Sequence, residues 1–339
     1  MNWSLRLKGQ NKGDPTLWKI GNVEIENQIV AAPLAGISKP VYRSLMREYG
    51  AGLTVSEMIS DKALHYENKK TFDMCRTLPN EHPVSLQLFG NDPETMGEAA
   101  RYLTTHTDCD IIDINMGCPV NKVIKAHAGS YLMAHPNEAY DVVKAVVDNT
   151  NRPVTVKMRA GWDHDHINCV EIAQLCEKAG AKAVAVHGRT RAQMYTGQSD
   201  PKYIKMVKEA VRIPVIGNGD IKSAQDALDM LAYTKCDAIM VGRALIGKPY
   251  LIKEIKNAMD GKEIQEVSFL ERLDLCKEYA RRLCEDETEY TGIREIRGIA
   301  PMYLTGMPHA SHYKNAITQV TSLKDFNKII EEYKEKICE

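Results

Sequence analysis

The chain has 339 residues, 44% of them hydrophobic, and its 44 Lys/Arg against 45 Asp/Glu leave a net charge of −1 at pH 7. This length suits one large domain with a small appendage, and the balanced charge excludes a basic nucleic-acid-binding footprint spread over the whole chain. No apolar run is long enough to span a bilayer, and residues 1–6 lack the apolar core of a signal peptide, so we expect a cytoplasmic protein without a membrane segment.

Eight short apolar segments predict buried strands. They are Gln28–Ala32, Leu53–Ser56, Val84–Leu88, Asp110–Asn115, Val154–Lys157, Ala183–His187, Val215–Gly217 and Ala238–Val241. Amphipathic segments between most of them predict helices, for example Pro93–Thr105, Pro136–Asn149, Ile167–Ala179, Pro201–Val211 and Ser223–Ala232. Strands alternating with helices indicate an α/β protein with parallel βαβ units, and eight units in about 225 residues are typical of a (β/α)8 TIM barrel. The alternative, an open doubly wound sheet, would normally carry a glycine-rich dinucleotide turn after its first strand, and none is present there.

The strand pattern stops near Gly261, which predicts a barrel domain over 1–260 and a small all-α helical domain over 261–339. The expected helices of the second region are Ser268–Glu289, Ile293–Leu304, Ala310–Thr318 and Ser322–Cys338. This region has 12 Lys/Arg against 15 Asp/Glu, compared with 32 against 30 in the rest of the chain. Any nucleic-acid surface on it must therefore come from local clustering of basic residues.

Polar residues follow most of the predicted strands, where TIM barrels carry their functional groups. Gln87, Asn115, Lys157 and Arg159, and His187 occupy four of these strand ends. The loops after the seventh and eighth strands, Gly217–Asp220 and Gly242–Arg243, are those that often bind phosphate through backbone N–H groups. Either loop alone could be a tight turn or a helix start, but together they favour a phosphorylated ligand.

The apolar run Asp110–Asn115 delivers Cys118 to a loop closed by Pro119. A thiol at this edge of an α/β barrel is a candidate reagent, and the alternative is that it packs as a small hydrophobe. The nine cysteines include no C-x-x-C pair, which favours reduced thiols over a disulfide framework or a zinc site. We expect no metal.

Flavin mononucleotide (FMN) is a phosphorylated ligand that matches these strand ends. Gln87 could pair with the pyrimidine edge of the flavin ring, and Lys157 could lie near N1 and O2, where negative charge accumulates on reduction. The alternative for Lys157 is a structural ion pair with a carboxylate at the barrel mouth.

Taken together, the motifs between about residues 30 and 250 resemble the tRNA-dihydrouridine synthase family, most closely its bacterial B type. In chain order they are Pro33–Ile37, Gln87–Gly90, Asn115–Pro119 with Lys122–Val123, Val156–Trp162, Val186–Thr190, Gly217–Ile221 and Val241–Ala244. The Asn-x-Gly-Cys-Pro element combined with His-Gly-Arg-Thr is specific, whereas either alone is weak. The chain departs from the family in two places: Ser38–Lys39 stands where Thr-Asp is common, and only Arg297 remains of a basic Arg-Lys-His element in the helical region, which in the family binds tRNA.

The resemblance implies an FMN enzyme that takes hydride from NADPH and reduces the C5–C6 double bond of particular uridines in tRNA. Cys118 would be the proton donor, because hydride addition at C6 leaves negative charge at C5, and a thiol with a pKa of about 8.5 is protonated at neutral pH yet can give up its proton. Asn115, Arg159 and Arg189 would lie near the substrate base, and the protein is expected to be a monomer. The FMN contacts carried over by matching motif are Pro33, Leu34, Ala35, Gln87, Lys157, His187, Asn218, Gly219, Asp220, Gly242 and Arg243.

Two other functions are compatible with these residues. An FMN barrel reductase acting on a free pyrimidine or an enone would explain the barrel but not the helical region. A non-catalytic tRNA-binding or tRNA-folding protein could keep the flavin as a structural cofactor, although Cys118, Lys157 and His187 are all in place.

Overall fold

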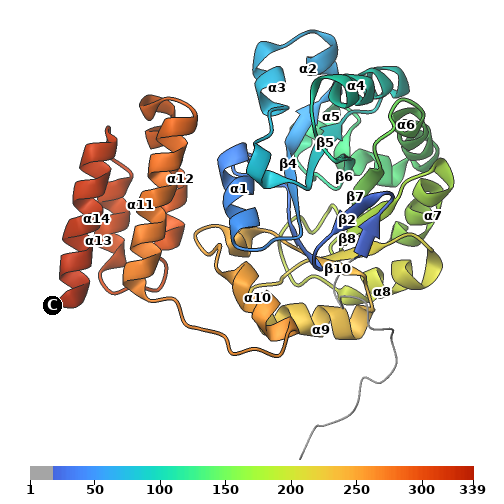
Figure 1. Ribbon diagram of the computed structural model, residues 1–339. Coiled ribbons are helices and arrows are strands. Elements are labelled where there is room, and N and C mark those ends of the chain that lie inside the picture. The colour runs from blue at the N-terminus through green and yellow to red at the C-terminus, as the bar shows by residue number, and fades with distance from the viewer. Residues whose placement is uncertain (1–17) are drawn as a thin grey trace, which may run out of the picture.

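The computed structural model describes residues 18–339, and its larger part is a closed barrel of eight parallel strands (Figure 1). The strand order around the barrel is β10-β3-β4-β5-β6-β7-β8-β9. The strands are β3 (Ile29–Ala31), β4 (Leu53–Ser60), β5 (Val84–Phe89), β6 (Ile111–Met116), β7 (Val154–Arg159), β8 (Ala183–His187), β9 (Val215–Asn218) and β10 (Ala238–Val241). The TIM barrel expected from the sequence is therefore confirmed. The amino-terminal residues judged unlike a signal peptide lie outside the described part of the chain.

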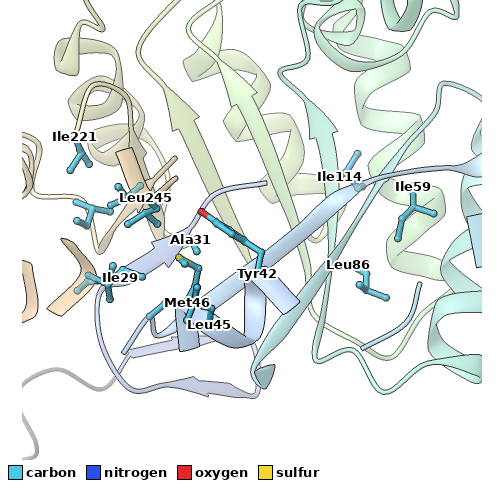
Figure 2. Close-up of a cluster of buried hydrophobic side chains, with 14 of the residues drawn as sticks. Ile29, Ala31, Tyr42, Leu45, Met46, Ile59, Leu86, Ile114, Ile221 and Leu245 are labelled. Atoms are coloured by element: carbon cyan, nitrogen blue, oxygen red, sulfur yellow. The ribbon is translucent and has the colours of Figure 1, made fainter. Parts of the chain in front are cut away.

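Helices cover the outside of the barrel because alternate strand residues point outward and are apolar. In β3, for example, Ile29 and Ala31 pack against Tyr42, Leu45 and Met46 of α1, as Figure 2 shows. The surrounding helices are α1 (Pro40–Glu48), α2 (Asp61–His65), α3 (Lys69–Met74), α4 (Pro93–His106), α5 (Asn121–Lys125), α6 (Pro136–Asp148), α7 (Cys169–Ala179), α8 (Pro201–Ala210), α9 (Ala224–Thr234) and α10 (Leu251–Met259). Three short 3-10 helices lie between them: η1 (Pro79–Glu81), η2 (Gly129–Ala134) and η3 (Arg243–Leu245).

A small antiparallel hairpin, which the sequence analysis did not anticipate, lies at the amino-terminal end of the barrel. It consists of β1 (Trp18–Ile20) and β2 (Val23–Ile25). Ile20 and Ile25 are fully buried in one cluster with inward-facing residues of the barrel strands. The hairpin therefore closes the end of the barrel opposite to the carboxyl ends of the strands.

The chain ends in four helices that stand beside α1 (Figure 1): α11 (Phe269–Asp286), α12 (Glu289–Tyr303), α13 (Ala310–Ile317) and α14 (Leu323–Cys338). A capping box at Ser268, in which Glu271 bonds back to the Ser268 N–H, begins α11. Tyr279 and Tyr303 of these helices belong to the same buried cluster as Tyr42 of α1. The predicted helical region is confirmed. Its boundary at residue 261 stays a prediction, because one buried core includes residues on both sides of it.

Ion pairs reinforce the contact between the barrel and the four helices. Lys39, at the start of α1, pairs with Glu287 and Glu295. Arg76 pairs with Asp286, and Glu48 accepts a 2.7 Å hydrogen bond from Arg282. Over residues 18–339, no helix is long and apolar enough to cross a membrane, and no group of three or more His, Cys, Asp or Glu side chains could hold a metal ion.

Candidate active site

A cavity of about 710 Å³ opens at the carboxyl ends of the barrel strands. Every candidate site residue named from the sequence lines it, although these residues are spread over more than 200 positions of the chain. They are Pro33, Leu34, Ala35, Gln87, Asn115, Cys118, Lys157, Arg159, His187, Arg189, Asn218, Gly219, Asp220, Gly242 and Arg243. Their convergence follows from the fold, since all parallel strands of a barrel end at the same face.

Cys118 is half-buried, and its backbone is held on both sides. Its N–H donates to Asn115 Oδ1 at 2.9 Å, and its carbonyl oxygen accepts hydrogen bonds from the N–H and the hydroxyl of Ser130. Burial raises the pKa of the thiol, against the opposing effect of the Val120 N–H and the charges of Arg159 and Lys157. The group is therefore a protonated thiol at neutral pH, as an acid requires.

Beneath Cys118, a buried polar layer crosses three strands. Gln87, Asp113 and Thr155 lie side by side in the register of β5, β6 and β7. Gln87 Nε2 and the Thr155 hydroxyl each donate to the Asp113 carboxylate, and Asn115 Nδ2 donates to Gln87 Oε1 at 2.8 Å. Burial raises the pKa of Asp113, whereas these two hydrogen bonds and the charge of Lys157 act to lower it.

Lys157 points into the cavity and forms no ion pair within the described part of the chain, which does not support the structural alternative considered for it. Burial, together with the charge of Arg159, lowers its pKa to about 8. Its ammonium group is therefore mostly charged at neutral pH, and the Asp113 carboxylate acts on it through its charge, without a salt bridge between the two among the described residues. A bound anion would raise the pKa of Lys157 again and so offset the effect of burial.

His187 is buried beside the same cations. Burial and the charges of Lys157 and Arg159 lower its pKa to about 2, so the imidazole is neutral at physiological pH. Arg189, only 2% exposed, lies 3.4 Å from His187 Nε2 through Nη1. A neutral imidazole beside a guanidinium can accept a hydrogen bond at Nε2. His187 therefore gives the cavity a polar but uncharged lining at this position.

The two arginines expected near the substrate base are largely occupied by the protein itself. Arg159, 2% exposed, donates to the carbonyl oxygens of Gly117, Thr190 and Met194. Arg189 donates to the carbonyl oxygens of Thr196 and Gly197 and to the Asp220 carboxylate at 2.7 Å. Both therefore anchor the loop after β8, a role that sequence spacing does not reveal, and contact with a base stays a prediction.

The loops after β9 and β10 line one end of the cavity. Gly219 has a φ of +131°, and a Cβ there would lie 2.1 Å from Ser199 Oγ, so only glycine fits. The hydroxyl of Ser199 is itself buried without a hydrogen-bond partner. Lys222 and Arg243 line this end and supply positive charge. A glycine turn, an unpartnered hydroxyl and two cations suit an anionic group such as the phosphate of FMN.

The lining residues that were not site candidates from the sequence include Met58, Tyr195 and Lys222. Tyr195 is 52% exposed, and the Arg243 guanidinium carbon lies 4.6 Å from its ring centroid. Tyr195 follows the His-Gly-Arg-Thr-Arg segment, so its place after β8 was an available signal. Met58 belongs to the part of β4 that lies beyond the predicted strand Leu53–Ser56.

Comparisons with known proteins agree over nearly the whole chain. A family model described as "Dihydrouridine synthase (Dus)" matches residues 29–338. The chain is 41% identical over 303 residues to "tRNA-dihydrouridine synthase B" of Vibrio cholerae serotype O1, covering 89% of this chain and 94% of that protein. It is 37% identical over 320 residues to "Probable tRNA-dihydrouridine synthase" of Rickettsia bellii, covering 93% and 97%. The structure of histamine dehydrogenase from Rhizobium sp. 4-9 is similar in fold, with a TM-score of 0.51 at 15% identity over 71% of this chain and 47% of that one.

Proposed function

The chain belongs to the dihydrouridine synthase family, and we propose that it reduces the C5–C6 double bond of particular uridines in tRNA, in the cytoplasm and as a monomer, with FMN as cofactor and NADPH as reductant. The observation that carries this proposal is that Cys118, Lys157 and His187 line the same cavity as the glycine loops after β9 and β10.

The residues of the chain would divide the work between the two ends of the cavity. Gly219, Gly242 and Arg243 would hold the FMN phosphate, and Gln87 and Lys157 would face the flavin ring, with Pro33, Leu34 and Ala35 along the barrel mouth. When bound, FMN would supply the hydride that uracil receives at C6. The positive charge of Lys157 would favour the reduced, anionic cofactor, since Lys157 lines the cavity and forms no salt bridge with a described carboxylate.

Cys118 would deliver the proton to C5. Its raised pKa keeps the thiol protonated, and its backbone is fixed by Asn115 and Ser130, so the proton is held in one place. The cations Lys157 and Arg159 nearby would stabilise the thiolate that remains after transfer. Reprotonation from solvent would then complete the cycle.

The test is mass spectrometry of tRNA nucleosides from cells that lack the gene, with the modified positions mapped. We expect dihydrouridine to disappear at specific positions and to return when the gene is restored, but not when a Cys118→Ala copy is supplied. Unchanged dihydrouridine would favour a reductase of free pyrimidines or enones. Dihydrouridine restored in full by the Cys118→Ala copy would favour a different proton donor.

A further inference from the structure

The polar layer under Cys118 contains a carboxylate whose position in the barrel calls for an explanation. Asp113 is 4% exposed and points into the barrel, as does Ile111 two residues earlier on the same strand. Ile111 lies in the apolar cluster that fills the lower barrel. Burying a carboxylate costs free energy that hydrogen bonds or an opposite charge must offset, and an apolar residue of similar size would fill the same space without that cost. Filling space is therefore not sufficient to account for an aspartate at this position.

We propose that Asp113 is a positioning residue that fixes the loop carrying Cys118, acting through the side-chain amides of Gln87 and Asn115. This inference rests on the proposed function only in assigning the proton to Cys118.

The chain of hydrogen bonds is continuous from strand to loop. Gln87 Nε2 donates to Asp113 Oδ2 at 2.6 Å, and Asn115 Nδ2 donates to Gln87 Oε1 at 2.8 Å. The N–H groups of Gly117 and Cys118 then donate to Asn115 Oδ1 at 3.0 and 2.9 Å. Gln87, Asp113 and Asn115 are all at least 93% buried, so water has little access to these groups.

The two ends of this chain determine its direction. A backbone N–H can only donate, so the Asn115 side chain must turn its oxygen toward Gly117 and Cys118. The amide nitrogen of Asn115 then donates to Gln87, which must accept through Oε1. Gln87 Nε2 therefore faces residue 113. The Oδ2 atom of Asp113 accepts this N–H and completes the sequence, so every group is satisfied in this orientation of the two amides. Without an acceptor at position 113, a buried N–H of Gln87 is left unpaired, and flipping Gln87 would transfer the mismatch to Asn115 and the Cys118 loop.

Three variants separate this role from simple support of the barrel. Asp113→Leu keeps the approximate shape and removes the acceptor. Asp113→Asn retains an oxygen that can face Gln87 while its nitrogen faces the Thr155 hydroxyl, so it should rescue. Thr155→Val removes the other hydrogen bond to Asp113 without touching the amides, and serves as the matched control.

The first readout is the reoxidation of chemically reduced, FMN-loaded enzyme by tRNA in the absence of oxygen. Asp113→Leu should slow it about 10- to 100-fold, the cost of one buried unpaired donor, whereas Asp113→Asn and Thr155→Val should stay within about fivefold of wild type. FMN content is measured for each variant, so that cofactor loss is not mistaken for misplacement of the thiol. Equal losses in Asp113→Leu and Thr155→Val would overturn the proposal.

The second readout does not depend on activity. Alkylation of Cys118 by iodoacetamide is followed by peptide mass spectrometry, with Cys284 as internal reference because it is also half-buried but lies in α11. Asp113→Leu should raise the Cys118/Cys284 rate ratio severalfold, and a wild-type ratio would overturn the positioning role. If Asp113→Leu does not fold, Gln87→Met breaks the same chain one step higher and must raise the same ratio. Should Cys118→Ala reduce tRNA normally, the proton-donor role fails while this ratio still decides the role of Asp113.

Discussion

At the scale of single residues, the thiol of Cys118 is the group whose loss should have the most selective effect. Cys118→Ala should leave FMN content and flavin reduction by NADPH unchanged, because neither step needs a proton on the uracil. Reoxidation by tRNA should slow about 10²–10⁴-fold, the usual contribution of a positioned general acid. Stopped-flow spectroscopy of the two half-reactions measures this directly. Cys118→Ser should recover little, since a hydroxyl is a far weaker acid; wild-type reoxidation in the alanine variant would make Cys118 a packing residue.

His187 should make the protein acid-sensitive in a defined direction. Its folded pKa of about 2 lies below the ordinary value of 6.5, so the unfolded chain binds more protons between these values. The free energy of unfolding is therefore highest above pH 6.5 as far as His187 is concerned. It falls as the pH drops below that value, by up to about 1.4 kcal/mol per pH unit. Urea unfolding at pH 7 and pH 5 should show wild type losing about 2 kcal/mol more than His187→Gln. Parallel losses in the two proteins would contradict a neutral His187.

At the scale of secondary structure elements, α1 is held to the barrel by a buried ion pair. Arg43 donates through Nε and Nη2 to both carboxylate oxygens of Glu81, at 2.7 and 3.0 Å, and both side chains are at most 2% exposed. Arg43→Met leaves the Glu81 carboxylate buried and unpaired, and should destabilise by about 3–5 kcal/mol. The matched control is Lys19→Met, which breaks the pair with Glu24 where both side chains are 57% exposed, and should change stability by less than about 1 kcal/mol. Chemical denaturation that ranks the two variants equally would contradict this reading of burial.

The sequence predicted elements well where apolar periodicity is strong and less well where local geometry interrupts it. β8 and β10 have the predicted bounds, and the last four helices differ from prediction by a few residues. β4 extends to Ser60 rather than Ser56, because a register shift between Val55 and Met58 breaks the alternation that would have identified it. The β1–β2 hairpin was missed because its strands have three residues each, although Gly21-Asn22 is a recognisable hairpin turn.

The candidate site was predictable in its members but not in their partners. Motif order and strand ends were enough to collect Cys118, Lys157 and Arg243 at one face. The anchoring of loops by Arg159 and Arg189 depends on which carbonyl groups lie within reach, and this is fixed only once the strands are closed into a barrel. Asp113 was predicted only as part of an apolar strand, because its partners Gln87 and Thr155 lie on neighbouring strands and are known only from the closed barrel.

At the scale of the whole molecule, the two departures from the family pattern both involve the helical region. Lys39 of the barrel pairs with Glu295 and Glu287 of the helical region, and the same region binds Arg297 to its own Val320 carbonyl. Arg297 is thus committed to the fold, whereas Arg294 is exposed. The position of the helical region relative to the barrel mouth therefore depends on the ion pairs of Lys39 with Glu287 and Glu295, and Lys39 is one of the departures from the family pattern.

Reversing one of these charges should weaken substrate use without weakening flavin chemistry. Lys39→Glu places a third carboxylate beside Glu287 and Glu295, and should increase hydrogen exchange in α11 and α12 and lower kcat/KM for tRNA about 5- to 20-fold, while NADPH-driven flavin reduction is unchanged. The double variant Lys39→Glu with Glu295→Lys restores opposite charges and should recover most of the loss. If the double variant is no better than the single one, the ion pairs do not set the position of the helices.

The hairpin at the closed end of the barrel has a kinetic consequence. Because Ile20 and Ile25 seal the amino-terminal end, the cavity is reached from the carboxyl face alone, and under the proposed function NADPH and tRNA would both approach the flavin from that side. A nicotinamide ring and a uracil cannot lie against one face of the isoalloxazine at once, so the oxidised nicotinamide would have to leave before tRNA binds. Double-reciprocal plots with tRNA and NADPH as varied substrates should accordingly be parallel lines, the signature of a ping-pong mechanism in which the reduced enzyme waits, loaded, for its substrate.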